Sequence, residues 1–157
     1  MLRRCHRFFC SRLRDAAGGV SVEFAVIGTV FILLVCGILD FGHAWYMKQI
    51  VTNASREGAR YGVMYQFNPA TNARKPPNAF NPTIKDYVLN NYLAKTSLPA
   101  NAKPDVTPAG TGYTTGTKGA PVEVTVTATK TWFILSGLVP GLGSQKTLKA
   151  TTVMQCE

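Results

Sequence analysis

The chain has 157 residues and a formal net charge of +9, with 17 Lys and Arg against 8 Asp and Glu. Five arginines fall in the first 14 residues, and the other cations are scattered from Lys48 to Lys149, so no basic stripe indicates nucleic-acid binding. Of the four cysteines only Cys156 lies beyond residue 36, which excludes a disulfide framework there. We expect Cys156 to be an unpaired thiol near a loose end, with pairing between chains as the alternative.

An uncharged apolar stretch, Ala25 to Leu39, follows the arginine-rich head. Counted from Gly19, a helix to Leu39 is about 31 Å long, enough to cross a hydrocarbon core of about 30 Å. Since cations mark the cytoplasmic flank of a span, we expect a cytoplasmic N-terminus and an external C-terminal part. No small-x-small cleavage site follows Leu39, and the apolar run starts too far from Arg3 and Arg4 for a twin-arginine signal.

The junction in front of this run reads Ala17-Gly18-Gly19-Val20-Ser21-Val22-Glu23-Phe24. Carboxylates are rare in membrane spans, so the presence of Glu23 at this position needs an explanation. Cleavage after Gly18 would free the amino group of Gly19, which could pair with Glu23 within one chain or between neighbouring helices. Alternatively, Glu23 lies in the first helical turn, where a negative charge is favoured by the macrodipole. Gly18, without a side chain, lets an extended segment lie in a protease cleft.

Apolar residues keep helical spacing beyond the membrane run and predict one helix from about Gly19 to Gln66, ended by Asn68-Pro69. Ala54, Gly58 and Gly62 recur every four residues along this helix. Such a strip lets another helix or sheet approach closely. The strip serves either packing with another chain or packing with this domain's own sheet.

The rest of the chain predicts a small mixed domain. Residues 68–82 are typical of a loop, and a second helix is expected from Asn81 as N-cap, with Pro82 in its first turn, to about Lys95. Residues 96–119 are loop-like, with a brief strand near Val106. Alternating residues predict a strand at 121–130 and an antiparallel partner at 148–155. The fold class is α+β, a long helix followed by a short helix and an antiparallel sheet, divided as 1–18 leader, 19–39 membrane span, 40–66 helix continuation and 67–157 domain.

The connector between the two predicted strands, residues 132–143, is more apolar than a solvated loop. It either folds under the sheet as core, or docks on a partner subunit or on the bilayer surface, where a Trp suits the interface. The candidate contact residues are Trp132, Phe133, Ile134 and Leu135.

No catalytic constellation is visible. His6 and His43 are the only histidines, and no serine or cysteine cluster accompanies them. The sequence has no phosphate loop, no dinucleotide fingerprint and no metal-ligand spacing. We expect no enzymatic activity, no cofactor, no metal and no small-molecule substrate; in an enzymatic step, the chain is itself the substrate.

Three segments together resemble the TadE-like pseudopilins of bacterial tight-adherence (Flp-type) pilus systems. They are the Gly18–Ala25 junction with its apolar run, Asp40-Phe41-Gly42, and the helical segment Asn53-Ala54-Ser55-Arg56-Glu57-Gly58-Ala59-Arg60-Tyr61-Gly62. The ending from Lys149 to Glu157 resembles the family's C-terminal strand. The middle of the chain carries no resemblance.

The resemblance implies an inner-membrane precursor whose leader is removed by a prepilin peptidase. Gly18, Gly19, Glu23 and Phe24 then have processing roles, with cleavage after Gly18 preferred because it makes Glu23 the fifth mature residue. The implied partners are the inner membrane, the peptidase, other pilins or pseudopilins and the pilus assembly machinery, in support of adhesion and biofilm formation. The alternative is an unprocessed single-pass protein that serves as an envelope scaffold or adhesion module.

Overall fold

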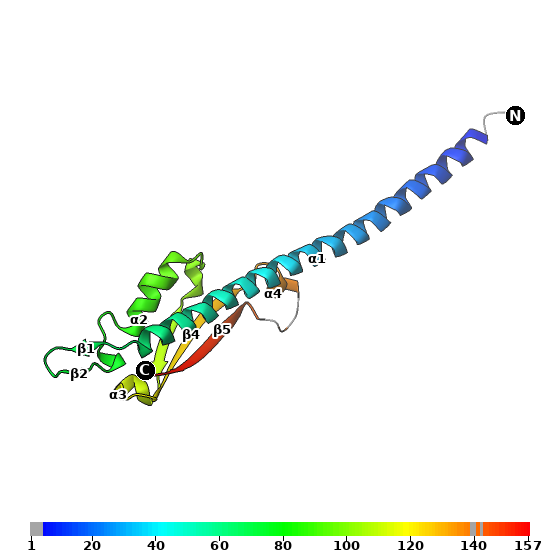
Figure 1. Ribbon diagram of the computed structural model, residues 1–157. Helices are drawn as coiled ribbons and strands as arrows, with labels where there is room; N and C mark the ends of the chain where they lie inside the picture. Colours follow the sequence, from blue (N-terminus) through cyan, green and yellow to red (C-terminus); the bar gives the residue numbers. More distant parts are fainter. Residues whose placement is uncertain (1–4, 139–140, 142) are drawn as a thin grey trace. The chain divides into compact units, whose positions relative to one another are not determined.

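The computed structural model describes residues 5–138, 141 and 143–157, with side chains described for residues 19–137, 141 and 143–157. The chain divides into two compact units, Met1–Leu39 and Asp40–Glu157. One helix, α1 (Cys5–Val63), contributes to both units (Figure 1). The expected helix from Gly19 to Gln66 is therefore present and ends three residues earlier. It begins at Cys5 and not at Gly19, so Glu23 does not lie in the first turn of this helix.

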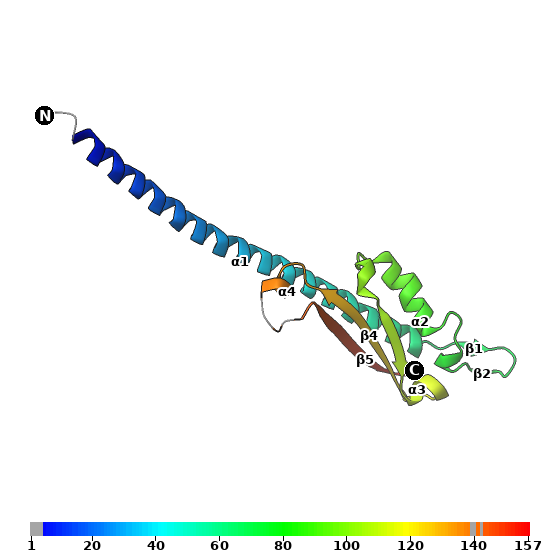
Figure 2. The same ribbon diagram turned by 180° about the vertical axis from the view of Figure 1, so that it is seen from behind.

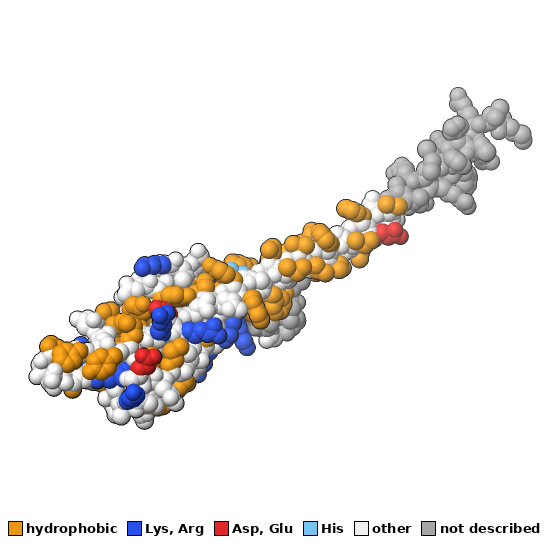
Figure 3. All heavy atoms as spheres, in the orientation of Figure 1, with side chains coloured by type: hydrophobic (Ala, Val, Ile, Leu, Met, Phe, Trp, Pro, Cys, Tyr) orange, Lys and Arg blue, Asp and Glu red, His pale blue; other side chains and the backbone are white. Residues whose placement is uncertain are grey.

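The first unit consists of the N-terminal part of α1. Among the described residues, Gly19–Val63 is the one stretch of helix long and apolar enough to cross a membrane. Hydrophobic side chains spread along the visible face of this part of α1 and stay uncovered; Phe24 is 76% and Ile27 68% exposed (Figure 3). Residues 1–4 of the predicted leader lie outside the described residues, and for 5–18 only the helical backbone is described.

The second unit has the α+β architecture that the sequence predicted. Its three-stranded antiparallel sheet has the order β3-β4-β5, with β3 at Asp105–Ala109, β4 at Pro121–Thr131 and β5 at Gln145–Gln155. The second half of α1 runs alongside β4 and β5 in two opposite views (Figures 1 and 2). The helix therefore covers one face of the sheet.

The register of the sheet explains which side chains form the core. Val122 of β4 pairs with Met154, and Val126 pairs with Ala150 of β5. Every second residue of β4 from Val122 is buried, while the residues between them are partly exposed. Cys156 is 3% exposed and belongs to this core. Cys156 is a free thiol, as expected, but the expectation of a loose end was wrong, because the chain stays packed to its penultimate residue.

The predicted second helix is present, with a different start. It consists of α2 (Ile84–Asp86), the π-helical turn η2 (Tyr87–Tyr92) and η3 (Leu93–Lys95). Its N-cap is Thr83, whose hydroxyl accepts a hydrogen bond from the Asp86 N–H, and not Asn81 as predicted. The Thr83 hydroxyl thus satisfies one of the free N–H groups of the first turn.

Short elements complete the domain. They are β1 (Phe67–Asn68) paired with β2 (Ala73–Arg74), η1 (Pro77–Ala79), η4 (Ala100–Ala102), α3 (Thr111–Thr115) and α4 (Leu135–Leu138). The loop predicted at 68–82 thus carries a two-residue hairpin and one helical turn.

The strip of small residues on α1 faces this domain's own core. A Cβ added at Gly58 would lie 2.8 Å from a methyl carbon of Val88 and 3.0 Å from one of Val124. A Cβ at Gly62 would lie 2.8 Å from Ile84. Glycine therefore lets the helix approach α2, η2 and β4 more closely than any other residue would.

Candidate functional site

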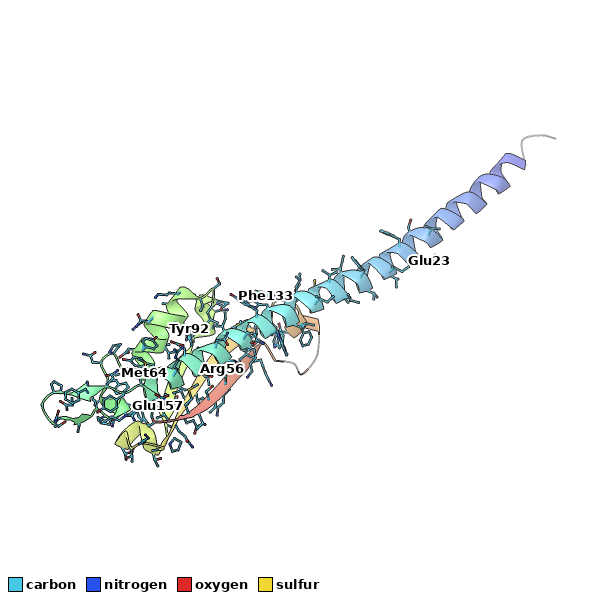
Figure 4. All side chains as sticks on the ribbon, in the orientation of Figure 1. Glu23, Arg56, Met64, Tyr92, Phe133 and Glu157 are labelled. Carbon is cyan, nitrogen blue, oxygen red and sulfur yellow. The ribbon has the colours of Figure 1, made fainter. Side chains whose placement is uncertain are left out.

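The predicted processing residues all lie within α1. Gly18, Gly19, Glu23 and Phe24 have helical backbone, and the side chains of Glu23 and Phe24 are exposed. A Cβ added at Gly19 would meet no atom within 4 Å. Figure 4 labels Glu23 on the described part of the first unit. The structure brings these residues together along one helical segment; their processing role remains a prediction.

A second site lies at the start of the second unit, around the buried carboxylate of Asp40. Its side chain is 1% exposed and lies 3.2 Å from the Nζ of Lys130, which is 0% exposed. The same carboxylate accepts backbone N–H hydrogen bonds from Phe133 and Ile134 at 3.0 Å and from Leu135 at 3.2 Å. We call this set the Asp40 clamp: Asp40, Lys130 and the N–H groups of residues 133–135.

The clamp is electrostatically balanced. Burial by itself would raise the pKa of Asp40, but the three backbone hydrogen bonds and the hydrogen bond from Lys130 outweigh it and lower the pKa from 3.8 to about 2. The carboxylate is therefore ionised at neutral pH. An ionised buried carboxylate is tolerable only because four donors replace its lost water.

Aromatic rings surround the clamp. The Lys130 ammonium lies 4.3 Å from the ring centre of Phe133 and 5.3 Å from that of Trp132. Trp132 meets Phe41 edge to face with ring centres 5.8 Å apart, and Phe133 lies 5.3 Å from His43. Burial first and the Lys130 charge second lower the pKa of His43, while Asp40 opposes them. The histidine is therefore neutral at pH 7.

The candidate contact residues 132–135 of the connector, for which the sequence left three locations open, do not lie under the sheet. Phe133 is 71% and Ile134 40% exposed, while Trp132 and Leu135 are half-buried. Figure 4 places Phe133 beside α1, at the opposite end of the second unit from Met64 and Glu157 (Figure 4). The clamp thus holds the backbone of the connector while two of its apolar side chains stay outside the core.

The segment 53–62 of α1 links the helix to the domain through side chains of different kinds. The Ser55 hydroxyl donates to the Thr52 carbonyl and lies 2.8 Å from the Thr152 hydroxyl. Tyr87 donates from its hydroxyl to Glu57 at 3.0 Å, and its ring stacks on Tyr61 with centres 4.1 Å apart. This hydrogen bond, with burial as the second cause, raises the pKa of Tyr87. The motif therefore docks the helix onto the domain.

Sequence reasoning named Asp40 only within the resembling segment Asp40-Phe41-Gly42, and it missed Lys130 and the ion pair between the two, although each residue left a signal. Lys130 continues the inward-facing positions of β4, which are Val122, Val124, Val126 and Ala128. A lysine on the apolar face of a strand needs a buried anion. Asp40 is the acidic residue directly after the apolar run. The two observations mark both residues as unusual, but only the fold shows that they pair.

The described residues contain no group of three or more His, Cys, Asp or Glu side chains that could hold a metal ion. The ion pair of the clamp is enclosed, and its donors and acceptors bind one another. The arrangement positions the connector between β4 and β5.

Comparison with known proteins agrees with the resemblance seen in the sequence. The family model of TadE-like proteins matches residues 18–60, which include the junction, the apolar run, Asp40 and most of the segment that docks α1 onto the domain. No curated protein and no solved structure matches the chain. Over residues 18–60, which hold the apolar N-terminal helix, the chain is similar to the TadE-like protein family.

Proposed function

We propose that this chain is a minor pseudopilin or assembly protein of a tight-adherence (Flp-type) pilus, anchored in the bacterial inner membrane and processed by a prepilin peptidase. The observation that carries the proposal is the Gly18–Glu23 junction directly before an uncovered apolar helix, within the TadE-like match. The basic head is the cytoplasmic leader, and Asp40–Glu157 lies on the periplasmic side.

The double glycine supports processing at this point. Residues 5–63 form one helix, yet a peptidase needs an extended strand in its cleft. Each glycine in a helix interior destabilises it by about 1 kcal/mol relative to alanine. Gly18 and Gly19 therefore make this the place where α1 unwinds most easily, next to the membrane entry.

Glu23 supports assembly of the mature protein. Cleavage after Gly18 leaves a new amino group at Gly19 and a carboxylate four residues further on. In the low-dielectric interior of a helix bundle, such opposite charges find each other because an unpaired ion there is costly. Pairing between neighbouring chains would set the register of α1 against other pilins.

Removal of the leader tests the proposal against the alternative of an unprocessed envelope scaffold or adhesion module. The full chain is isolated from cells with and without prepilin peptidase, and its N-terminus is sequenced. We expect Gly19 as the first residue only where the peptidase is present. Recovery of Met1 from both strains would leave the scaffold as the better account.

A matched pair of variants locates the cleaved bond. Gly18→Val places a β-branched side chain at the junction and should block leader removal. Gly28→Val makes the same change ten residues further along, where an added Cβ meets nothing within 4 Å, and should be processed normally. Normal processing of Gly18→Val would show that the peptidase does not cleave after Gly18.

The role of Glu23 is tested separately. Glu23→Ala should insert into the membrane and be processed, but should assemble poorly with other pilins, as seen by pull-down and by counting pili. Glu23→Gln keeps the size and removes the charge, so it should behave like Glu23→Ala. Normal piliation of both variants would favour the helix-dipole explanation of Glu23.

A further inference from the structure

The connector between β4 and β5 is held in place by the Asp40 clamp, whose two buried charges are costly to remove from water. Three consecutive backbone N–H groups, those of residues 133–135, bind the Asp40 carboxylate, which is itself paired with Lys130. A buried ion pair is stable only when its geometry is close to ideal. The segment that the clamp holds, Trp132–Leu135, nevertheless exposes apolar side chains: Phe133 is 71% and Ile134 40% exposed. We call this segment the tip.

The position of the clamp along the chain ties this tip to the proposed membrane boundary. Asp40 directly follows Leu39, the last residue of the proposed span. The rings of Trp132 and Phe133 pack on Phe41 and His43, two and four residues beyond Leu39. At 1.5 Å per helical residue, these contacts lie within about 6 Å of the hydrocarbon edge.

This depth is where apolar and aromatic side chains enter a bilayer from its surface. Interfacial segments bury their apolar face about 5–10 Å into the boundary between headgroups and acyl chains, and Trp is enriched there. Phe41 and Trp45 of α1 are also exposed, at 62% and 71%. The tip therefore extends an apolar surface that begins on the helix.

Charge at the same end of the sheet fits a lipid surface. Lys146, the second residue of β5, pairs with Lys130 in the sheet and is exposed, so its charge is available to lipid phosphates, whereas Lys130 is used inside the clamp. In water the same apolar tip would be an aggregation hazard. Lipid is the one surrounding that both the tip and the adjoining α1 span require.

We propose that Trp132–Leu135 is a second membrane anchor, which docks on the bilayer surface from which residue 40 emerges. This inference rests on the proposed membrane span. Two attachment points, the span and the tip, would restrain the tilt of the domain on the membrane. The Asp40 clamp is then the positioning device that keeps the tip at the correct depth.

Quenching of tryptophan fluorescence by brominated lipids tests this proposal on the full chain. The Trp45→Phe chain, which keeps Trp132 as its only tryptophan, is reconstituted at one copy per nanodisc in phosphatidylethanolamine and phosphatidylglycerol. The control chain carries Trp45→Phe, Trp132→Phe and Phe67→Trp. Position 67 belongs to β1, at the other end of the second unit from α4, and is 52% exposed.

We expect brominated lipid to quench Trp132 by about half or more and to leave Phe67→Trp nearly unchanged, because an interfacial segment lies within reach of the acyl chains. Adding Phe133→Ser and Ile134→Ser to the Trp132-only chain should reduce the quenching to the control level. Those two changes leave the backbone N–H groups and Lys130 in place, and circular dichroism verifies that the fold is kept.

The outcomes separate the two proposals. A chain that fails to stay with the nanodisc overturns the span and the tip together. A chain that stays with the disc but shows equal quenching at positions 132 and 67 overturns only the tip. Absence of quenching at Trp132 in single-copy discs, together with cross-linking of position 132 to a second copy in discs that hold two, would also overturn it, since the occupant would then be a second copy of this chain.

Discussion

Residues 19–39 and 40–63 belong to one helix, yet their apolar side chains meet different surroundings. In the first part Val30 and Leu34 are 60% and 57% exposed, whereas in the second Met47 and Val51 are 1% and 0% exposed. The sheet and the short helices cover the second part. The comparison teaches that an apolar helix face does not identify what covers it: in the first part the apolar side chains stay uncovered, and in the second they pack into a protein core.

Two matched double substitutions to lysine, one in each part of the helix, should have the largest effects. Val30→Lys with Leu34→Lys places two charges in the span, each costing about 2.5–3.5 kcal/mol at a helix centre, and should abolish membrane integration. Met47→Lys with Val51→Lys buries two unpaired ions at several kcal/mol each, comparable with the about 5–15 kcal/mol that stabilises a domain. Carbonate extraction measures the first effect and protease resistance the second.

Each double variant is the control for the other. The pair at 30 and 34 should leave the folded domain protease-resistant, and the pair at 47 and 51 should leave the chain in the membrane. If either pair altered both readouts equally, the division of α1 into two environments would be refuted.

Two ion pairs of the second unit differ in burial and should therefore differ in how much they stabilise the domain. Lys130→Ala leaves Asp40 buried without its cation and should destabilise the domain by about 3–5 kcal/mol. Lys85 and Asp105 lie 2.8 Å apart but are about half exposed, so Lys85→Ala should change stability little. Chemical unfolding in detergent, followed by circular dichroism, measures both; equal losses would show that the clamp contributes no more than a surface pair.

Two glycines of α1 should respond oppositely to the same substitution. Gly58→Leu forces a side chain against Val88 and Val124 and should cost about 1–3 kcal/mol. A Cβ added at Gly42 would meet no atom within 4 Å, so Gly42→Leu should stabilise the helix by up to about 1 kcal/mol. The shift in the unfolding midpoint measures both, and a stabilising Gly58→Leu would mean that the strip is not tightly packed.

The smallest change in stability is expected when the pH is lowered from 5 to 2. Because the pKa of Asp40 is lowered to about 2 from 3.8, its contribution is present above pH 3.8 and is lost as pH falls toward 2. The shift corresponds to at most about 2 kcal/mol, and solvent screening at this edge of the domain reduces it. Unfolding free energies between pH 5 and pH 2 measure it, with Asp40→Asn as the variant that should lack this component. An identical pH profile in Asp40→Asn would contradict the assignment.

Local patterns were enough for the long elements of the fold. Helical spacing predicted α1 to within three residues of its end, and alternation predicted β4 with β5 as its antiparallel partner, because one face of each element must be apolar. The start of the second helix was misplaced, since Thr83 competes with Asn81 as a cap and single-residue boundaries depend on local geometry. The helical turn α3 left no clear signal.

By itself the sequence determined that one apolar helix leads into a small mixed domain with a TadE-like junction, because hydrophobic period, chain length and charge asymmetry are properties of neighbouring residues. Only the tertiary structure decided what covers each face. Asp40 and Lys130 lie 90 residues apart in the chain, and no local pattern brings them together. Their pairing depends on how β4 packs against α1, and this packing also decides that Gly58 faces the core and that Phe133 does not.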